Sequence, residues 1–569
     1  MIEVAGASSS PRSWAGAAAA SGLAVVTVAV WILATPMPAL RAELRVLQFW
    51  WLEACVFLGL AVAGAVIGEL ARTLDRRDIA AALLPALLGV GLTVTLPPRT
   101  NRIFYDEQIY QNVGRNLADS KRAQLCNDGA IRNGRLQCSA AEYNKQPYAF
   151  PHVLSLAYRT FGVRPWIPFA VNAAAMGLSV ALTYLLGRLL FADRLAALCA
   201  ATIFAVLPEQ IVWSASGAAE PSAVLAAIAA LVAAACFVES RSTTALAGVA
   251  IATAYAVQFR PESLLIVPIV VLLLWQRAPD ELAAPRTLWA ALLFVALAAP
   301  HFAHVVAVRN EGWGTSQERL AITYAVQNLR VNGWFFLHDA RFPTAVTLLA
   351  VVGWMVPRGR AGRAAIATYF LLFFAITLLF YAGSYDYGAD VRYSLLTNPP
   401  VAILAGFGAA WLMRWTAHRP LRIALCLILM AAAAAQYAVE SVPIVRATVD
   451  SAWAARADVE FARSFVPKLP PDSYVLTHNP GMFQVWGVNA GQMSFATDSR
   501  FLGERASQFH GGIYLHWNYW CNTQDRVHQA LCATVRSLRP VELAGEMRSQ
   551  DQHFAFYRMN VSRADHSNP

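Results

Sequence analysis

Long apolar runs separated by short polar loops make up most of the chain. Most of these runs contain about 18–24 residues, enough for a helix to cross the ~30 Å hydrocarbon core of a bilayer. The pattern predicts a polytopic α-helical membrane protein with about thirteen transmembrane helices. The first run could be a signal peptide, but its length and the lack of a convincing cleavage site favour a retained helix. The runs fall at about 16–37, 47–69, 79–97, 166–188, 195–213, 219–238, 244–259, 262–276, 287–306, 343–357, 364–383, 394–413 and 423–441.

The composition agrees with this fold class. The 569 residues are 57% hydrophobic and 14% charged, whereas a single soluble core stops growing at roughly 250–300 residues. Of the 45 basic residues behind the net charge of +10, only Lys121, Lys145 and Lys468 are lysines. Most arginines lie in short loops between apolar runs, and no basic stripe follows a soluble module. This distribution argues against nucleic acid as a partner.

The arginines also predict the orientation of the chain. The positive-inside rule places the arginine-rich loops in the cytoplasm, and with them the N-terminus. The alternate segments, including 98–150, 307–342 and everything after about residue 443, then lie outside. We expect a multi-pass protein of the inner (plasma) membrane with an external, periplasmic C-terminus. The arginine-rich loops lie at 72–77, 194, 241, 277–286, 358–363 and 414–422.

The last ~125 residues differ in character from the rest of the chain. Short runs that read as strands alternate with polar or helical stretches, which predicts a small soluble α/β domain. The strand-like runs are Ser473–Thr477, Met482–Trp486, Gln492–Ala496, Gly512–His516 and Phe554–Arg558. We expect four segments: N-terminal transmembrane helices in 1–97, a first external loop in 98–150, a transmembrane core in 151–442 and an external α/β domain in 443–569.

The eight cysteines divide by location. Four lie in apolar runs, where cysteine behaves as a small hydrophobe: Cys55, Cys199, Cys236 and Cys426. The other four form two close pairs in segments expected outside, Cys126 with Cys138 and Cys521 with Cys532. Disulfides persist in oxidising compartments, so we expect both pairs to be bridged rather than free thiols.

Charged and titratable residues collect at the external ends of the predicted helices. Ionisable groups in or beside a membrane are costly, so each is a functional candidate, although Arg260 with Glu262 could be a simple ion pair. Their clustering predicts one polar cavity at the outer surface. The residues are Asp106, Glu107, Lys145, Glu209, Glu220, Arg260, Glu262, His301, His304, Arg309, Asp386, Asp390 and Arg392.

Asp106 and Glu107 open the first long external loop, at the start of a predicted amphipathic helix. An aspartate at such a position is commonly an N-terminal cap that accepts free backbone N–H groups. Two adjacent acids at the membrane boundary also suit a carboxylate that accepts a proton from a hydroxyl, or that binds a metal ion. Both interpretations stay open for this pair.

Lys145 closes the same loop, where the chain re-enters the membrane. Lysine is rare in this sequence, and a compact ammonium is a suitable partner for a phosphate. A lysine that extends along the membrane interface is the alternative. The pattern alone does not choose between them.

Together these residues resemble the GT-C superfamily of membrane glycosyltransferases, in the branch of the protein O-mannosyltransferases and the lipid A aminoarabinose transferase. The acidic pair and Lys145-Gln146-Pro147 correspond to the loop motifs, and Phe259–Glu262 to an Arg-containing turn. Three further stretches resemble later motifs: Trp213–Pro221, Pro300–Gly312, and Arg392-Tyr393 with Pro399-Pro400. The departures are two extra apolar runs before the loop, a missing second proline after Lys145, and the insert 119–141.

The resemblance implies an enzyme that moves a single sugar from a polyprenyl-phosphate donor to the hydroxyl of a lipid, glycan or protein acceptor. Asp106 would be the general base for inverting attack, and Glu107 and Glu220 would position the acceptor or a divalent ion. Lys145, Arg260, Arg392 and Tyr393 would bind the donor phosphate. No nucleotide-sugar signature is present, as a lipid-linked donor allows.

Three other functions are compatible with a membrane protein of this kind. A transporter or flippase for a lipid-linked glycan typically has internal repeats and charges near the midplane, which this sequence lacks. A glycan polymerase or ligase is harder to separate, although the acidic pair favours transfer of one sugar. The third is a scaffold that has kept the fold without the activity.

Overall fold

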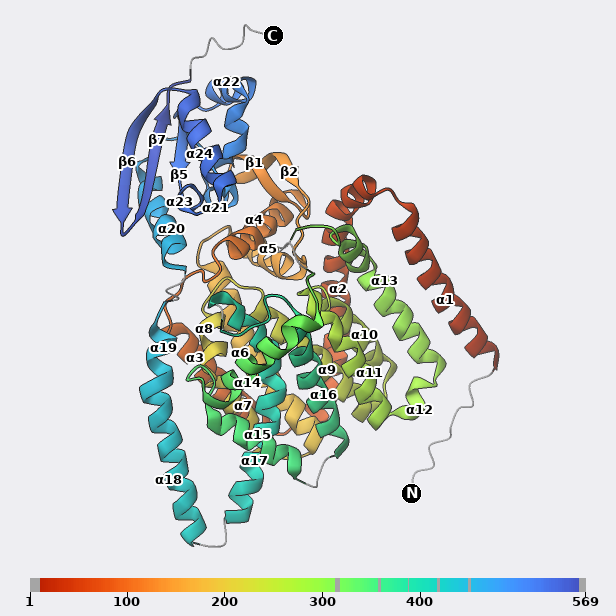
Figure 1. The fold of residues 1–569 in the computed structure, drawn as a ribbon. Helices are drawn as coiled ribbons and strands as arrows, with labels where there is room; N and C mark the ends of the chain where they lie inside the picture. The colour runs from red at the N-terminus through yellow and green to blue at the C-terminus, as the bar shows by residue number, and fades with distance from the viewer. Residues whose placement is uncertain are drawn as a thin grey trace. The chain divides into compact units, whose positions relative to one another are not determined.

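The computed structural model describes residues 11–312, 318–356, 360–386, 388–416, 420–448 and 452–561 (Figure 1). Arg358 and Arg419, which belong to the predicted cytoplasmic loops, lie outside the described residues, as does the side chain of Cys426. The chain forms two compact units, each described by itself below. Unit 1 contains residues 1–100, 145–150 and 169–447, and unit 2 contains residues 101–144, 151–168 and 448–569.

Among its described residues, unit 1 consists of helices and connecting segments, with one isolated β-bridge between Leu320 and Phe380. Its α-helices up to the middle of the chain are α1 (Pro11–Ala34), α2 (Met37–Thr73), α3 (Arg76–Thr95), α6 (Ile167–Phe191), α7 (Arg194–Ala205), α8 (Pro208–Ser214), α9 (Glu220–Ser240) and α10 (Thr243–Ala256). The later ones are α11 (Ile266–Arg277), α12 (Pro279–Leu282), α13 (Pro285–Ala307), α14 (Ala325–His338), α15 (Thr344–Met355), α16 (Arg360–Leu379), α17 (Asn398–Thr416), α18 (Pro420–Gln436) and α19 (Val442–Arg446). Short helices η1 (Pro261–Leu265), η2 (Ile322–Tyr324), η3 (Gly388–Thr397) and η4 (Tyr437–Ser441) join them.

Among the described residues, fewer helices are long and apolar enough to cross a membrane than the thirteen expected from the apolar runs. In the described residues eight helices are long and apolar enough to span, or nine if the bent pair α7–α8 is one span. The expected run 195–213 is broken because Pro208 lacks a backbone N–H and starts a new helix at an angle of 59°. The runs expected at 244–259 and 343–357 form helices of 10–17 residues. The prediction of a polytopic helical membrane protein is confirmed.

Glycines allow close helix packing in this unit. A Cβ on Gly406 of α17 would lie 2.3 Å from the Ala200 backbone nitrogen of α7. On Gly353 of α15 it would lie 1.9 Å from the Leu404 carbonyl oxygen. Small residues let helix backbones approach where lipid gives no hydrophobic driving force. Helix α17 is therefore packed tightly against both neighbours.

Unit 2 contains one seven-stranded sheet built from two distant parts of the chain (Figure 1). The strands are β1 (Leu125–Arg132), β2 (Arg135–Glu142), β3 (Tyr474–Thr477), β4 (Asn489–Gln492), β5 (Ile513–Trp517), β6 (Val541–Ser549) and β7 (Gln552–Met559). Their order is β2-β1-β4-β3-β5-β7-β6, and β4, β3 and β5 are mutually parallel. Strand β1, from the first loop, pairs antiparallel with β4 of the tail. The segment that we expected as a separate external loop therefore shares a sheet with the expected tail domain.

Helices complete unit 2. They are α4 (Tyr105–Ser120), most of α5 (Ala149–Phe161), α20 (Trp453–Phe465), α21 (Pro480–Val485), α22 (Ser499–Gln508), α23 (Tyr519–Asn522) and α24 (Arg526–Leu538), with the short helices η6 (Val466–Lys468) and η7 (Met493–Thr497). Two buried apolar clusters form the core, one around Leu476 and Leu515 and the other around Phe483 and Phe556.

The predicted α/β character of the tail is confirmed, but two of its five strands are wrong. The runs at Ser473, Gly512 and Phe554 become β3, β5 and β7. The run Met482–Trp486 is helix α21, because Pro480 can occupy a first helical turn and Gly487 adopts the positive φ (87°) that ends it. The run Gln492–Ala496 begins at the last residue of β4 and continues as the 3₁₀ turn η7.

Candidate functional site

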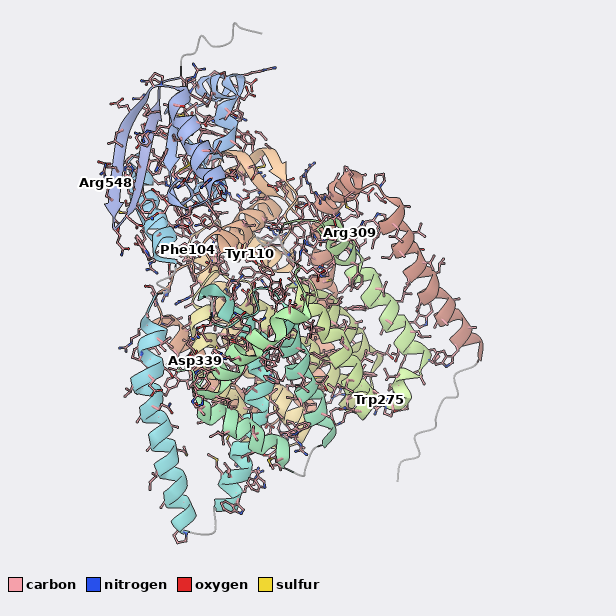
Figure 2. All side chains as sticks on the ribbon, viewed as in Figure 1. Phe104, Tyr110, Trp275, Arg309, Asp339 and Arg548 are labelled. Atoms are coloured by element: carbon pink, nitrogen blue, oxygen red, sulfur yellow. A yellow bond between two sulfur atoms is a disulfide. The ribbon has the colours of Figure 1, made fainter. Side chains whose placement is uncertain are left out.

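The first turn of α4 carries Asp106 and Glu107 (Figure 2 labels Phe104 and Tyr110 beside them). Glu107 is fully buried, and its Oε2 accepts hydrogen bonds from the backbone nitrogens of Arg102 (2.6 Å), Ile103 (3.0 Å) and Phe104 (3.1 Å). The bond from Phe104 is that of a capping box, in which a side chain in the first helical turn accepts from the backbone of the cap residue, and the other two donors belong to the turn before the helix. The Glu107 carboxylate thus serves as a cap that folds the chain before the helix.

The cap also holds an unusual backbone conformation. Phe104 has φ 54° and ψ −69°, in the region that side chains other than glycine avoid. The bonds to Glu107 from Phe104 and from the two residues before it keep the chain there. Asp106 lies two residues after Phe104 and is half-buried. Its position is therefore set by the turn that Glu107 stabilises.

Tyr105 is the other residue fixed at this turn. Its ring packs on Trp520 at a centroid distance of 4.8 Å and on Tyr519 at 5.9 Å. Burial, together with the nearby Asp458 and Tyr519, raises the pKa of its phenol. Tyr105 is therefore neutral and acts by packing.

In unit 1, two arginines converge on one buried glutamate. Glu220, at the start of α9, is 1% exposed, and its Oε1 lies 3.0 Å from Arg260 Nη1 and 3.0 Å from Arg392 Nε. Arg260 precedes η1 and Arg392 belongs to η3. Tyr393 lies against both guanidinium groups, with ring centroids 5.3 Å and 4.7 Å away. Two further acids, Glu262 (3.0 Å from Arg260) and Asp390 (3.6 Å from Arg392), complete this arginine cluster.

Local hydrogen bonds place Glu220 in the cluster. The turn before α9 is held by Asn172, whose Nδ2 donates to the carbonyls of Ser216 and Ala218 at 2.8 Å each. The Ser222 hydroxyl donates to Asn172 Oδ1 at 3.0 Å. Because these groups are buried, the turn has one well-satisfied conformation. The predicted motif Trp213–Pro221 thus forms the support for Glu220.

Lys145 belongs to the same unit as the arginine cluster. Its Nζ donates to the Gly312 carbonyl at 2.7 Å. Further along this short segment, the Ala149 backbone nitrogen donates to the Gln258 carbonyl at 3.2 Å. The re-entry segment of the loop therefore lies beside the turn that leads to Arg260. The structure brings together Glu220, Arg260, Arg392 and Tyr393 in one cluster and attaches the Lys145 segment to its edge.

A second charged group in unit 1 was missed at the sequence level. Arg341 forms a two-pronged ion pair with Asp339, with Nη2–Oδ2 2.5 Å and Nε–Oδ1 2.9 Å. Burial alone would lower the pKa of Arg341. The ion pair with Asp339 and the charges of Glu209 and Asp386 outweigh this effect and raise the pKa overall. The two predicted acids therefore belong to the surroundings of Arg341, and Glu209 also accepts from Trp213 Nε1 at 2.8 Å.

The predicted histidines are buried in helix α13. His301 and His304 stack on each other at 6.1 Å, and Tyr148 packs on His304 at 5.1 Å. Arg309 lies just beyond this helix and is labelled in Figure 2. Its carbonyl accepts from Arg319 Nη2 at 3.1 Å. These contacts favour a packing role for the two histidines, whereas Arg309 is exposed.

Within the described residues, one His/Cys/Asp/Glu group has ligand atoms close enough for a metal ion. It comprises His478, Cys521 and Cys532, whose ligand atoms lie within 4.8 Å of one another. The two sulfurs are joined in a disulfide, so they are not available as thiolate ligands. The second expected bridge, Cys126–Cys138, is also formed. Cys55, Cys199 and Cys236 are free, as expected.

The arrangement has the fold of the GT-C membrane glycosyltransferases, so the resemblance seen in the sequence is confirmed. Residues 145–304 match a family model described as dolichyl-phosphate-mannose-protein mannosyltransferase. No curated protein sequence matches the chain.

Two solved structures illustrate the shared fold. One is the archaeal oligosaccharyltransferase AglB from Archaeoglobus fulgidus, in complex with an inhibitory peptide and a dolichol-phosphate. It has a TM-score of 0.52 and 12% identity over 85% of this chain and 74% of that chain. The other is ArnT from Cupriavidus metallidurans bound to undecaprenyl phosphate. It has a TM-score of 0.50 and 14% identity over 85% of this chain and 97% of that chain.

Proposed function

We propose that the protein is a glycosyltransferase that moves one sugar from a polyprenyl-phosphate donor to an acceptor hydroxyl at the external face of the membrane. The observation that carries the proposal is the arginine cluster, in which Arg260 and Arg392 share Glu220 in a chain with a GT-C fold. Guanidinium groups bind phosphate oxygens through paired N–H donors. Both solved relatives hold a polyprenyl-type phosphate, which supports the same class of donor here.

In the proposed reaction Asp106 is the general base. Its carboxylate takes the proton of the acceptor hydroxyl as that oxygen attacks the anomeric carbon. The bond between this carbon and the phosphate oxygen breaks, and polyprenyl phosphate leaves with one additional negative charge. Attack from the side opposite the phosphate inverts the anomeric configuration. A positioned base typically contributes 10²–10⁴-fold to such a rate.

The charged residues of unit 1 have separate roles in this proposal. Arg260 and Arg392, assisted by Lys145, stabilise the charge that develops on the leaving phosphate. Glu220 holds the two guanidinium groups side by side, and Tyr393 packs against them. Glu107 holds the turn before Asp106. Any divalent ion would be held by carboxylates near the phosphate, and no step above depends on it.

A donor panel tests the proposal. Purified protein is incubated with a series of polyprenyl-phosphate sugars, and donor consumption and transfer to water or an added acceptor are followed by mass spectrometry. Asp106→Asn should abolish transfer and leave donor binding within twofold. Normal transfer by Asp106→Asn would remove Asp106 from the mechanism. If no donor is consumed while glycolipid moves across vesicles, the protein is a transporter.

The orientation is part of the proposal. A cytoplasmic N-terminus and an external tail place Asp106 on the side where flipped lipid-linked sugars are presented. A cysteine introduced at Arg548, in the exposed strand β6, should react with a membrane-impermeant maleimide in intact cells (Figure 2). Labelling that requires cell permeabilisation would reverse the orientation.

A further inference from the structure

One face of α4 is polar although it is buried. Gln108, Asn112 and Arg115 are spaced four and three residues apart, so they lie on one side of the helix. Their exposed fractions are 3%, 0% and 2%. Buried polar side chains are retained when partners satisfy them. We call these three residues the polar stripe of α4.

Besides local partners such as Asp119 and the backbone of Cys126 and Gly134, the polar stripe has partners in the tail part of the same unit. Asn112 Nδ2 donates to Gln484 Oε1 at 2.6 Å, and Arg115 Nη1 donates to the Gln484 carbonyl. Asn479 Nδ2 donates to Gln108 Oε1. Two residues of the tail, Asn479 and Gln484, therefore contact the whole length of the stripe.

Close packing accompanies these bonds. A Cβ on Gly481, at the start of α21, would lie 3.0 Å from Asn112 Cβ. At the other end of the interface, Tyr105 packs on Trp520 at 4.8 Å. Trp520 is itself packed on His528 at 4.8 Å. The first turn of α4 and its middle are thus both held.

The contacts occur at a particular edge of the sheet. Strand β3 has β4 on one side and β5 on the other, and all three are parallel, so the order in which strands are added to the sheet reverses between β3 and β5. In α/β sheets, ligands bind beyond the carboxyl ends of the strands at such a switch point. Asn479 follows β3 and Trp520 follows β5. Here that edge contacts α4, the helix whose first turn carries Asp106.

The bonds from the polar stripe to Asn479 and Gln484 all leave one face of α4. Rotation of α4 about its axis would therefore break all of them together. Resting on the function proposed above, we propose that Asn479 and Gln484 are positioning residues that fix the direction of the Asp106 carboxylate through the polar stripe. The tail is then part of the catalytic apparatus, and acts through α4 instead of touching the reacting atoms.

Substitution and exchange of the side-chain amides of Gln108 and Asn479 test this role. Asn479→Ala and Gln108→Ala should each lower kcat on the order of 10–100-fold, the range expected for a small misplacement of a catalytic group. The KM for the donor should stay within twofold, since the arginine cluster is untouched. The double variant Gln108→Asn/Asn479→Gln keeps the combined reach of the pair and should restore most of kcat.

Asn522→Ala is the matched control. This tail amide bonds the carbonyls of Asn518 (3.0 Å) and His553 (2.8 Å) and no residue of α4. It should lower thermal stability about as much as Asn479→Ala while leaving kcat unchanged. Equal loss of kcat in both variants would mean that the tail acts through stability alone, and would overturn the proposal.

Hydrogen exchange separates this inference from the proposed function. Amides 105–115 should exchange faster in Asn479→Ala than in Asn522→Ala or the swapped pair. This outcome does not need an active enzyme, so it stands even if no donor is turned over. Unchanged exchange of these amides together with unchanged kcat in Asn479→Ala would overturn the inference while Asp106 chemistry survived.

Discussion

Replacement of Glu107 distinguishes a cap from a catalytic group. In Glu107→Ala, three backbone donors lose their acceptor. Each bond to this charged group contributes roughly 1.5 kcal/mol, at the low end of the usual range. About 1–2 kcal/mol is recovered when Phe104 leaves its positive-φ conformation. The local free energy of opening the turn should therefore fall by about 3 kcal/mol. Glu107→Gln keeps an accepting oxygen in the same place and should lose only about 1 kcal/mol.

Hydrogen exchange of residues 102–108 measures this local free energy, and sugar transfer is measured on the same samples. We expect Glu107→Ala to open the turn and lose transfer, and Glu107→Gln to keep both largely intact. Asp106→Asn is the control, with normal exchange and no transfer. If Glu107→Gln lost transfer while its exchange stayed normal, the cap interpretation would be refuted and Glu107 would be a reacting group.

Three further results follow from other parts of the structure. Arg392→Lys should raise the KM for the donor about tenfold, because lysine lacks the fork that contacts Glu220 and Tyr393; unchanged donor kinetics would exclude a phosphate role. Gly406→Val should destabilise unit 1 by several kcal/mol, since its Cβ would meet backbone of α7, and a melting temperature equal to wild type would contradict the packing. Burial lowers the pKa of His478 to about 4. The unfolded chain binds this proton near pH 6.5, whereas the folded protein binds it only near pH 4. The free energy of unfolding should therefore fall by roughly 3 kcal/mol as the pH drops from about 6.5 to about 4. His478→Gln should flatten the pH dependence, and an unchanged profile would assign it elsewhere.

Hydropathy predicted the fold class because the bilayer imposes a length and a composition on every span. Within the described residues it gave more spans than there are long apolar helices, because runs such as 244–259 and 343–357 form helices of only 10–17 residues. It also did not register the break at Pro208, because a hydropathy window does not detect a missing N–H. The arginine cluster was within reach of sequence reasoning, since Glu220, Arg260 and Arg392 each stand out as charges beside apolar runs. Their convergence on one oxygen depends on tertiary packing.

The first loop was harder to predict. Asn133-Gly134, both with positive φ, is a typical two-residue hairpin turn, so the hairpin of β1 and β2 does have a local signal in the sequence. The pairing of β1 with β4 leaves no local trace, because the partners are far apart in sequence. The sequence pattern allows a cap at Asp106, whereas in the structure Glu107 has that role. The first turn of a helix can carry a capping acid at either of these positions. Which carboxylate bonds the backbone before the helix depends on the path of the preceding turn.

The pairing of β1 with β4 has a consequence for biogenesis. Gly129 leaves the ribosome roughly 360 residues before its partner Ala490, a delay of about 20–70 s at typical rates of synthesis. During that interval β1 is an unpaired sheet edge, which is prone to wrong associations. The Cys126–Cys138 bridge closes the hairpin without help from the tail. Oxidation early in synthesis would therefore preserve a folded template on which the last part of the polypeptide assembles.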